Sequence, residues 1–263
     1  MDNLQVLNEN IYRIEDGKYD IGIDLLKFIL RSAVSTVPQE FFIHNISCYY
    51  RDIGNDTLKS GVKCKIFKIK DGRNFVIRHA RATLGNQTIL ACEISFHRAE
   101  SVDPTVRHVR IDEDFPDNVS ISEQNQIDAI EISGLRIKKF LPKMNYFDLV
   151  NKRNTLHGVF RHHHGLVKLS SLKRDKNEDI IDLITVPLYT RTDFNSDSSF
   201  DLTVFLHEYS FDSSNWQLFE QSIPSNSVAD RVNVNARFWS AERRLLMTSR
   251  LEFELPRQIQ AKL

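Results

Sequence analysis

The sequence feature that most constrains the fold is an internal repeat. The stretch KDGRNFVIRHARATLGNQTILACEISFHR predicts a strand, a short turn and a second strand, and ADRVNVNARFWSAERRLLMTSRLEFELPR near the other end predicts the same. An offset of 156 residues (237 − 81) pairs Arg81 with Arg237, and without gaps it also pairs Leu90 with Leu246. The stretches agree in the order of their elements more than in their letters. The repeat predicts a chain built from one unit made twice.

A helical pattern precedes the first long strand of each copy. The segment IGIDLLKFILRSAV has apolar residues at helical spacing on a wide face, which predicts a mostly buried helix. Its shorter counterpart EDIIDLITVPLY predicts a helix that ends near Pro187. The offset carries Leu26 onto Asp182, so an aspartate stands in the second copy where the first has an apolar residue.

Each copy therefore predicts one apolar helix followed by antiparallel strands, since residues 41–50 and 200–207 both mix aromatic and β-branched side chains. A curled sheet around a central helix is the hot-dog arrangement, and two such units side by side would bury two sheet edges. We expect an α+β double hot-dog, with two curled antiparallel sheets each wrapped on a central helix. The predicted units are an N-terminal hot-dog at 1–98, a linker rich in Asp, Glu, Ser and Pro at 99–131, and a C-terminal hot-dog at 132–263.

Composition excludes several classes of protein. Lys and Arg together number 35, as do Asp and Glu, so no general attraction to nucleic acid or to an anionic membrane is expected. No window approaches the roughly 20 apolar residues of a membrane span, and the acidic start lacks the regions of a signal peptide. Cys48, Cys64 and Cys92 lack CxxC spacing, which favours a reducing compartment and buried, inert thiols.

Several motifs along the chain match those of one family, in the same order. In the first copy, TVPQEFFIHNISCYYRDIGN, KDGRNFVIRHARA and ISFH are similar to that family's TVPxxxxVHSxHxYFLRPGD, RDGRSFxxRRVxA and ASFQ or ASFH. In the second copy, IDLITVPL and FDSSNWQLFE are similar to SDLNFLPV and FxxNEWLLY. On these residues the chain resembles the type II acyl-CoA thioesterases, the double hot-dog family of bacterial thioesterase II and its peroxisomal relatives.

The resemblance implies hydrolysis of fatty acyl-CoA to free fatty acid and CoA, with no cofactor and no metal. It also implies a water held by an Asp on a helix, a Ser or Thr hydroxyl and a Gln on a strand. A carboxylate in hydrogen-bond reach orients the water and accepts its proton, while the amide and hydroxyl fix its remaining atoms. Backbone N–H groups at a helix N-terminus can stabilise the oxyanion.

The resemblance assigns these roles residue by residue. The Asp falls on Asp182, the residue that the repeat also singled out, and the hydroxyl falls on Ser199, with Ser198 an equal candidate. The Gln position is substituted by Leu251, on a strand face that is apolar. The family opens its first helix with GGQ, where this chain has Gly22 followed by Ile and Asp, so the second glycine and the Gln are gone.

Two functions remain open on this evidence. The first is an acyl-CoA thioesterase with activity weakened by Leu251, and the alternative is a catalytically impaired paralogue that binds acyl-CoA or pairs with an active thioesterase. A hot-dog hydratase is a third hypothesis, but its paired Asp and His on one short stretch are not found. The histidine run 162–164 favours no metal site, because neighbours on a strand alternate faces. The basic cluster 136–143 suits either CoA phosphates or a solvated edge.

The last three residues predict a targeting signal. Ala261-Lys262-Leu263 resembles the SKL-type tripeptide read by the peroxisomal import receptor, whose signal includes the terminal carboxylate. We therefore expect location in the peroxisomal matrix, with acyl-CoA substrate and the import receptor as partners and neither nucleic acid nor a membrane span. The sequence leaves the oligomeric state open, and the resemblance is compatible with a homo-oligomer.

Overall fold

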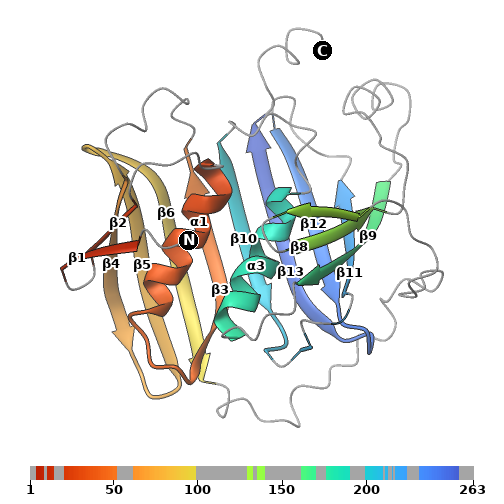
Figure 1. The fold of residues 1–263 in the computed structure, drawn as a ribbon, viewed down its shortest axis with the longest axis horizontal. Helices are drawn as coiled ribbons and strands as arrows, with labels where there is room; N and C mark the ends of the chain where they lie inside the picture. Colours follow the sequence, from red (N-terminus) through yellow and green to blue (C-terminus); the bar gives the residue numbers. More distant parts are fainter. Residues whose placement is uncertain are drawn as a thin grey trace, which may run out of the picture.

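The computed structural model describes residues 4–8, 11–14, 21–51, 62–98, 129–132, 135–139, 161–169, 176–189, 199–209, 211–212, 215, 217–223 and 231–254. These residues form one antiparallel sheet of 13 strands, with two helices lying side by side on one of its faces (Figure 1). We call the face under the helices the inner face and the opposite one the outer face.

Each copy supplies one helix and a run of strands. The first copy contributes β1 (Leu4–Asn8), β2 (Ile11–Ile14), α1 (Ile21–Val34), β3 (Phe41–Tyr50), β4 (Val62–Asp71), β5 (Phe75–Leu84) and β6 (Gln87–Arg98). The second copy contributes β7 (Ala129–Ile132), β8 (Leu135–Lys139), β9 (Arg161–Leu169), α3 (Lys176–Tyr189), β10 (Phe200–Leu206), β11 (Gln217–Ile223), β12 (Arg231–Trp239) and β13 (Leu245–Glu254). The predicted linker lies mostly outside the described residues, and its bounds stay a prediction.

The strand order shows how the copies join. It runs β1-β2-β4-β5-β6-β3-β10-β13-β12-β11-β9-β8-β7, so β3 and β10 form the junction and each copy extends outward from it in an equivalent order. At the junction the strands are antiparallel, and Ser47 lies opposite Thr203 near the middle of the pairing. Each copy thereby satisfies the edge that the other would leave open. The predicted joining of two curled sheets is confirmed.

The hairpins β5–β6 and β12–β13 are equivalent in the repeat, and both contain a β-bulge. One bulge falls between Ala82 and Thr83, and its counterpart falls between Phe238 and Trp239, which is 156 residues later (238 − 82). The offset of 156 found in the sequence therefore also relates equivalent positions in the structure, as far as this bulge.

The turns that follow differ by one residue. Gly85 and Asn86 alone close the first hairpin. In the second, three residues lie between Ser240 and Arg244, where the N–H of Ser240 donates to the carbonyl of Arg244 at 2.8 Å. The extra residue moves every later position of β13 along by one.

The pairing of the strands shows the new offset. Leu90 lies opposite Ala82 in the first hairpin, and Met247 lies opposite Phe238 in the second, so the offset in β13 is 157 (247 − 90). The predicted equivalence of Leu90 and Leu246 is thus wrong by one residue. A gap-free comparison could not detect it, because Leu246 and Met247 are both apolar and both buried.

The helices form because their apolar faces are wide enough to be covered by the sheet and by each other. α1 spans the predicted 14 residues, and Leu26 and Leu30 are fully buried. α3 ends at Tyr189, two residues beyond Pro187 and at the last residue of the predicted segment EDIIDLITVPLY. A proline so close to the C-terminus removes only one backbone hydrogen bond, so the last turn persists. Neither these helices nor any other in the described ranges is long and apolar enough to cross a membrane.

The inner face is apolar with few exceptions. Cys48, Cys64 and Cys92 are buried free thiols, as predicted. Burial raises the pKa of Cys64 to about 12, which keeps that thiol protonated and unreactive. Arg78 is buried too, but its guanidinium donates to the hydroxyl and backbone carbonyl of Thr36 at 2.9 and 3.1 Å, which fastens the end of α1 to the sheet.

Candidate active site

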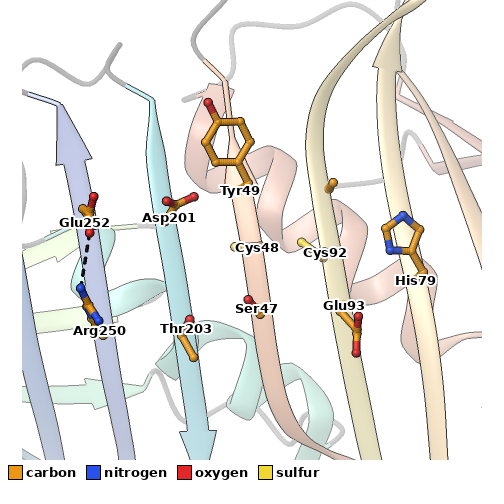
Figure 2. Close-up of a pocket in the computed structure, with 11 residues that line it drawn as sticks. Ser47, Cys48, Tyr49, His79, Cys92, Glu93, Asp201, Thr203, Arg250 and Glu252 are labelled. Atoms are coloured by element: carbon orange, nitrogen blue, oxygen red, sulfur yellow. Dashed lines mark hydrogen bonds and ion pairs between the residues drawn. The ribbon is translucent and has the colours of Figure 1, made fainter.

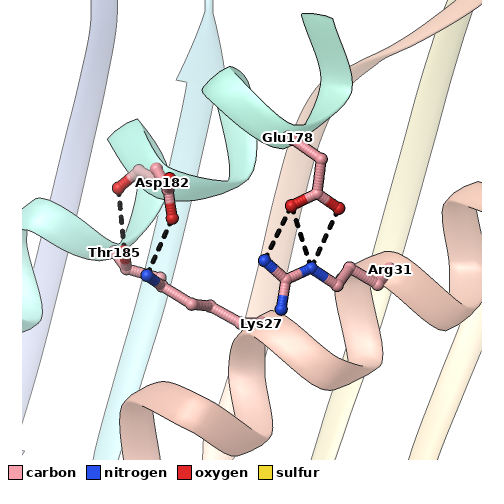
Figure 3. A network of polar contacts seen from close by, with 5 residues as sticks. All are labelled: Lys27, Arg31, Glu178, Asp182 and Thr185. Atoms are coloured by element: carbon pink, nitrogen blue, oxygen red, sulfur yellow. Dashed lines mark hydrogen bonds and ion pairs between the residues drawn. The ribbon is translucent and has the colours of Figure 1, made fainter. Parts of the chain in front are cut away.

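The candidate site is centred on an ion pair between the two helices. Lys27 of α1 donates from Nζ to Oδ1 of Asp182 of α3 at 2.7 Å (Figure 3). The side chains are 1% and 2% exposed, so the pair is closed off from bulk water. The predicted catalytic aspartate is therefore buried against the other copy of the repeat. Removing one partner of such a pair costs about 3–5 kcal/mol, because the other charge stays buried and unpaired.

A second ion pair lies one helical turn away. Arg31 donates from Nε and Nη2 to the carboxylate of Glu178, at 2.9 and 2.7 Å (Figure 3). This pair is partly exposed, at 25% and 31%. The hydrogen bond to Glu178 raises the pKa of Arg31, against the opposing effect of burial. Because Lys27 pairs with Asp182 and Arg31 with Glu178, the helices run antiparallel, and the two pairs offer an internal comparison of a buried and a partly exposed carboxylate.

The hydroxyl nearest to Asp182 in sequence serves the helix. Thr185 donates from Oγ1 to the backbone carbonyl of Asp182 at 2.8 Å, three residues back in α3. This local bond is typical of a threonine within a helix. Its acceptor is the backbone carbonyl of Asp182 and not the carboxylate.

The strand beneath α3 carries Leu251, at the predicted Gln position. Leu251 is 1% exposed and lies on the inner face of β13, between Leu202 of β10 and Val234 of β12 in the sheet. Two residues away on the same face, Ser249 is buried, and its Oγ has no hydrogen-bond partner within the described residues. Sequence reasoning missed Ser249, although its spacing of two from Leu251 on a strand was the available signal.

The predicted catalytic hydroxyl belongs to Ser199. It is half-buried and directly precedes β10, whose first residue is Phe200. A Cβ added at Gly22 would lie 3.2 Å from the Phe200 ring, so the first turn of α1 packs closely on the start of β10, and a side chain there would require the ring to shift slightly. Gly22 and Lys27 are separated by about 7.5 Å of helix rise. The first turns of α1 thus contact the elements that carry both Ser199 and Asp182.

Other predicted residues lie outside the described ones, namely Ser198 and the terminal Ala261, Lys262 and Leu263. The peroxisomal address and the homo-oligomer stay predictions. The histidine run 162–164 lies within β9. Among the residues that the structure describes, no group of three or more His, Cys, Asp or Glu side chains could hold a metal ion.

The outer face carries a shallow polar cavity at the junction of the copies. It measures about 540 Å³ and includes Ser47, Thr203, Asp201, Arg250 and Glu252 in its lining (Figure 2). Burial, and then the charge of Glu252, raise the pKa of Asp201. Asp182 does not line this cavity, because the sheet separates the cavity from the helices.

The inner arrangement fits water chemistry only in part. A carboxylate that acts as a general base must direct a lone pair at the water it deprotonates. Asp182 directs Oδ1 at an ammonium, and Leu251 supplies no hydrogen-bonding group. The site therefore has a buried carboxylate, but its contact with Lys27 and the apolar Leu251 differ from the groups that the resemblance implies for holding a water.

Solved structures of known proteins share this architecture, although no family model and no curated protein matches the sequence significantly. An acyl-CoA thioesterase II from Mycobacterium marinum has 18% identity and a TM-score of 0.64, with 96% of this chain and 95% of that chain covered. The tesB protein of Mycobacterium avium subspecies paratuberculosis has 12% identity and a TM-score of 0.65, with 96% of each chain covered. A hot dog fold protein of unknown function from Alicyclobacillus acidocaldarius has 10% identity and a TM-score of 0.64, again with 96% of each chain covered.

These similarities extend over nearly the whole of this chain and of each compared chain, so both copies and their joining are shared. The chain has the α+β double hot-dog fold that its repeat predicted. The resemblance to the type II acyl-CoA thioesterases is confirmed at the level of the fold.

Proposed function

We propose that this protein hydrolyses acyl-CoA thioesters, with Asp182 as the carboxylate that orients and deprotonates the attacking water. One observation carries the proposal. Among the described residues, Asp182 is the only buried carboxylate, and it occupies the helix position that the motif IDLITVPL assigns to the catalytic Asp. Buried carboxylates are costly to fold around, and they gather at functional sites. The fold shared with thioesterase II proteins supports the same chemistry.

The reaction has two steps. Water attacks the thioester carbonyl carbon while its proton passes to Asp182, which forms a tetrahedral oxyanion. We infer that backbone N–H groups at the start of α1, where Gly22 lies beside the Phe200 ring of β10, stabilise that oxyanion. The intermediate then breaks its C–S bond, and the leaving thiolate takes the proton from Asp182. The products are a free fatty acid and CoA with its thiol restored.

Release of the CoA thiol from a series of acyl-CoA chain lengths tests this proposal. We expect slow but measurable release, because losing one of several groups that hold the reacting atoms costs about 10²- to 10³-fold. Asp182→Asn should abolish it. Glu178→Gln is the matched control, since it removes the other carboxylate between the same helices, and it should leave the rate within about twofold. An unchanged rate in Asp182→Asn would reject Asp182 as the base.

A second candidate function is favoured by the ion pair and by Leu251. A protein whose carboxylate is held by an ammonium, over an apolar strand, suits acyl-CoA binding without turnover, alone or beside an active thioesterase. Titration calorimetry with acyl-CoA distinguishes the two. Binding without thiol release would support this second function, and thiol release that depends on Asp182 would exclude it.

A further inference from the structure

Lys27 and Asp182 each break the apolar pattern of their own helix. The offset of 156 pairs Lys27 with Leu183 and Leu26 with Asp182. The position equivalent to each charged residue is therefore apolar in the other copy. The two exceptions meet at the crossing of the helices, at 2.7 Å. Neither charge would be stable there alone, because a buried charge without a partner is costly.

The ammonium occupies the place that the reaction needs for water. Its Nζ lies at hydrogen-bond distance from Oδ1 of Asp182, where the oxygen of an attacking water would lie. A protonated amine has three N–H donors and no lone pair, so it cannot attack a carbonyl carbon. Lys27 therefore donates a hydrogen bond to the carboxylate as a water would, but it cannot act as the nucleophile.

The pair also opposes proton transfer to Asp182. If Asp182 took a proton from water, the ammonium of Lys27 would face a neutral carboxyl group while only 1% exposed. That state removes the negative charge of Asp182 from beside a buried cation, which is unfavourable. The partly exposed pair of Arg31 and Glu178 has a smaller consequence, because water reaches both side chains.

We propose that Lys27 is an inhibitory partner of Asp182 and slows hydrolysis at this site. The inference rests on the proposed function and identifies what restrains that same site. It assigns Lys27 no contact with the substrate. It predicts that removing the ammonium, while keeping the carboxylate, gives a faster enzyme.

The test compares thiol release by wild type with Lys27→Ala, Lys27→Gln and Lys27→Arg. Gln keeps a hydrogen-bond donor for Asp182 without a charge, whereas Ala removes the donor as well. We expect both neutral variants to be about tenfold or more faster, within the range that general bases contribute. Lys27→Arg keeps the charge and should stay slow. Arg31→Met, which breaks the partly exposed pair with Glu178, is the matched control and should change the rate by less than about twofold.

Two further readouts separate this role from a structural one. In Lys27→Ala, propylammonium replaces the atoms removed and should slow the enzyme again, while sodium chloride at equal ionic strength should not. The double variant Lys27→Gln/Asp182→Asn should lose the gain. Circular dichroism and thermal melting confirm folding of each variant. If neither neutral variant folds, the pair serves stability alone and the proposal fails.

The outcomes also separate this inference from the proposed function. Asp182-dependent release by wild type, with no gain in a folded Lys27→Gln variant, would overturn the inference and leave the function standing. A silent wild type with an active Lys27→Gln variant would support the inference. Silence of both, with acyl-CoA bound, would reject both.

Discussion

Leu251 offers a test of the site that is independent of Lys27. It is the inner-face residue where the resemblance implies an amide, and it is 1% exposed. We expect Leu251→Gln to raise thiol release by about tenfold or more, if the amide can hold the water. The same change should lower the free energy of unfolding by about 1–3 kcal/mol, because it buries an amide that competes poorly for partners. Chemical denaturation and the thiol assay measure the two effects.

Leu202 is the control for this prediction. It lies directly opposite Leu251 in the pairing of β10 with β13 and is also fully buried. Leu202→Gln should cost similar stability and give no gain in rate. Equal rates in the two glutamine variants would show that the position of Leu251 has no special relation to the reacting water.

The residue scale also shows where sequence reasoning reached its limit. Asp182 could be found from its motif and from the apolar residue at the matching position of the first copy. Lys27 could not, because a lysine beside a leucine-rich helical face is most often solvated. Its partner is 155 residues away, and only the packing of the helices brings them together. Ser249 was missed for a similar reason, since its burial depends on its neighbours in the sheet.

At the scale of elements, the two hairpin turns use the same left-handed backbone conformation at two different residue types. Gly85 has a φ of 57° and Arg243 a φ of 60°, a region that favours glycine. A Cβ at Gly85 would meet no atom within 4 Å, so only the backbone would oppose it. We expect Gly85→Ala to cost about 1 kcal/mol and Arg243→Gly to gain up to about 1 kcal/mol.

Thermal melting measures both turn variants. A change of 1 kcal/mol should move the midpoint by about 2–4 °C in a chain of this size, downward for Gly85→Ala and upward for Arg243→Gly. A downward shift in both would mean that the side chain of Arg243 contributes more than its backbone conformation costs.

The same turns explain what the sequence could predict about the elements. The pattern of apolar residues placed the first helix at its observed bounds, because its face is wide and its flanks are polar. The offset failed beyond the second turn, where one inserted residue left the apolar pattern of β13 nearly unchanged. The end of α3 near Pro187 was also predicted, and the last turn continues to Tyr189 because a proline disrupts a helix less in its last turn than in its interior.

At the scale of the whole molecule, the junction of the copies carries a histidine cluster. The rings of His44 and His97 stack at 3.9 Å, and a hydrogen bond of 2.8 Å joins His44 Nδ1 to the hydroxyl of Tyr209, which follows β10. His207 lies nearby and donates to or accepts from Thr248 at 3.0 Å. The cluster thus links β3 and β6 of the first copy to the second copy.

Protonation of this cluster should weaken the junction. Burial, and then the neighbouring His44, lower the pKa of His97 to about 4 from its ordinary 6.5. Burial also lowers the pKa of His44 and of His207. Between pH 6.5 and about 4 the unfolded chain therefore binds a proton at His97 that the folded chain does not, so the free energy of unfolding falls as the pH falls. Above pH 6.5 His97 is neutral in both states and contributes no pH dependence.

The measurement is the denaturation midpoint of wild type and His97→Gln at several pH values from 7.5 down to about 4.5. Carboxylates add a pH dependence of their own, but it is common to both proteins and cancels in the difference. We expect the wild type to lose more stability than His97→Gln over this range, because only the wild type has an imidazole that must stay neutral in the fold. His44→Gln should reduce the loss as well, since it removes the charge that faces His97 across the stacked pair. Parallel pH profiles in all three proteins would show that His97 takes up its proton in the folded state as readily as in the unfolded chain, and that the junction tolerates a charged pair.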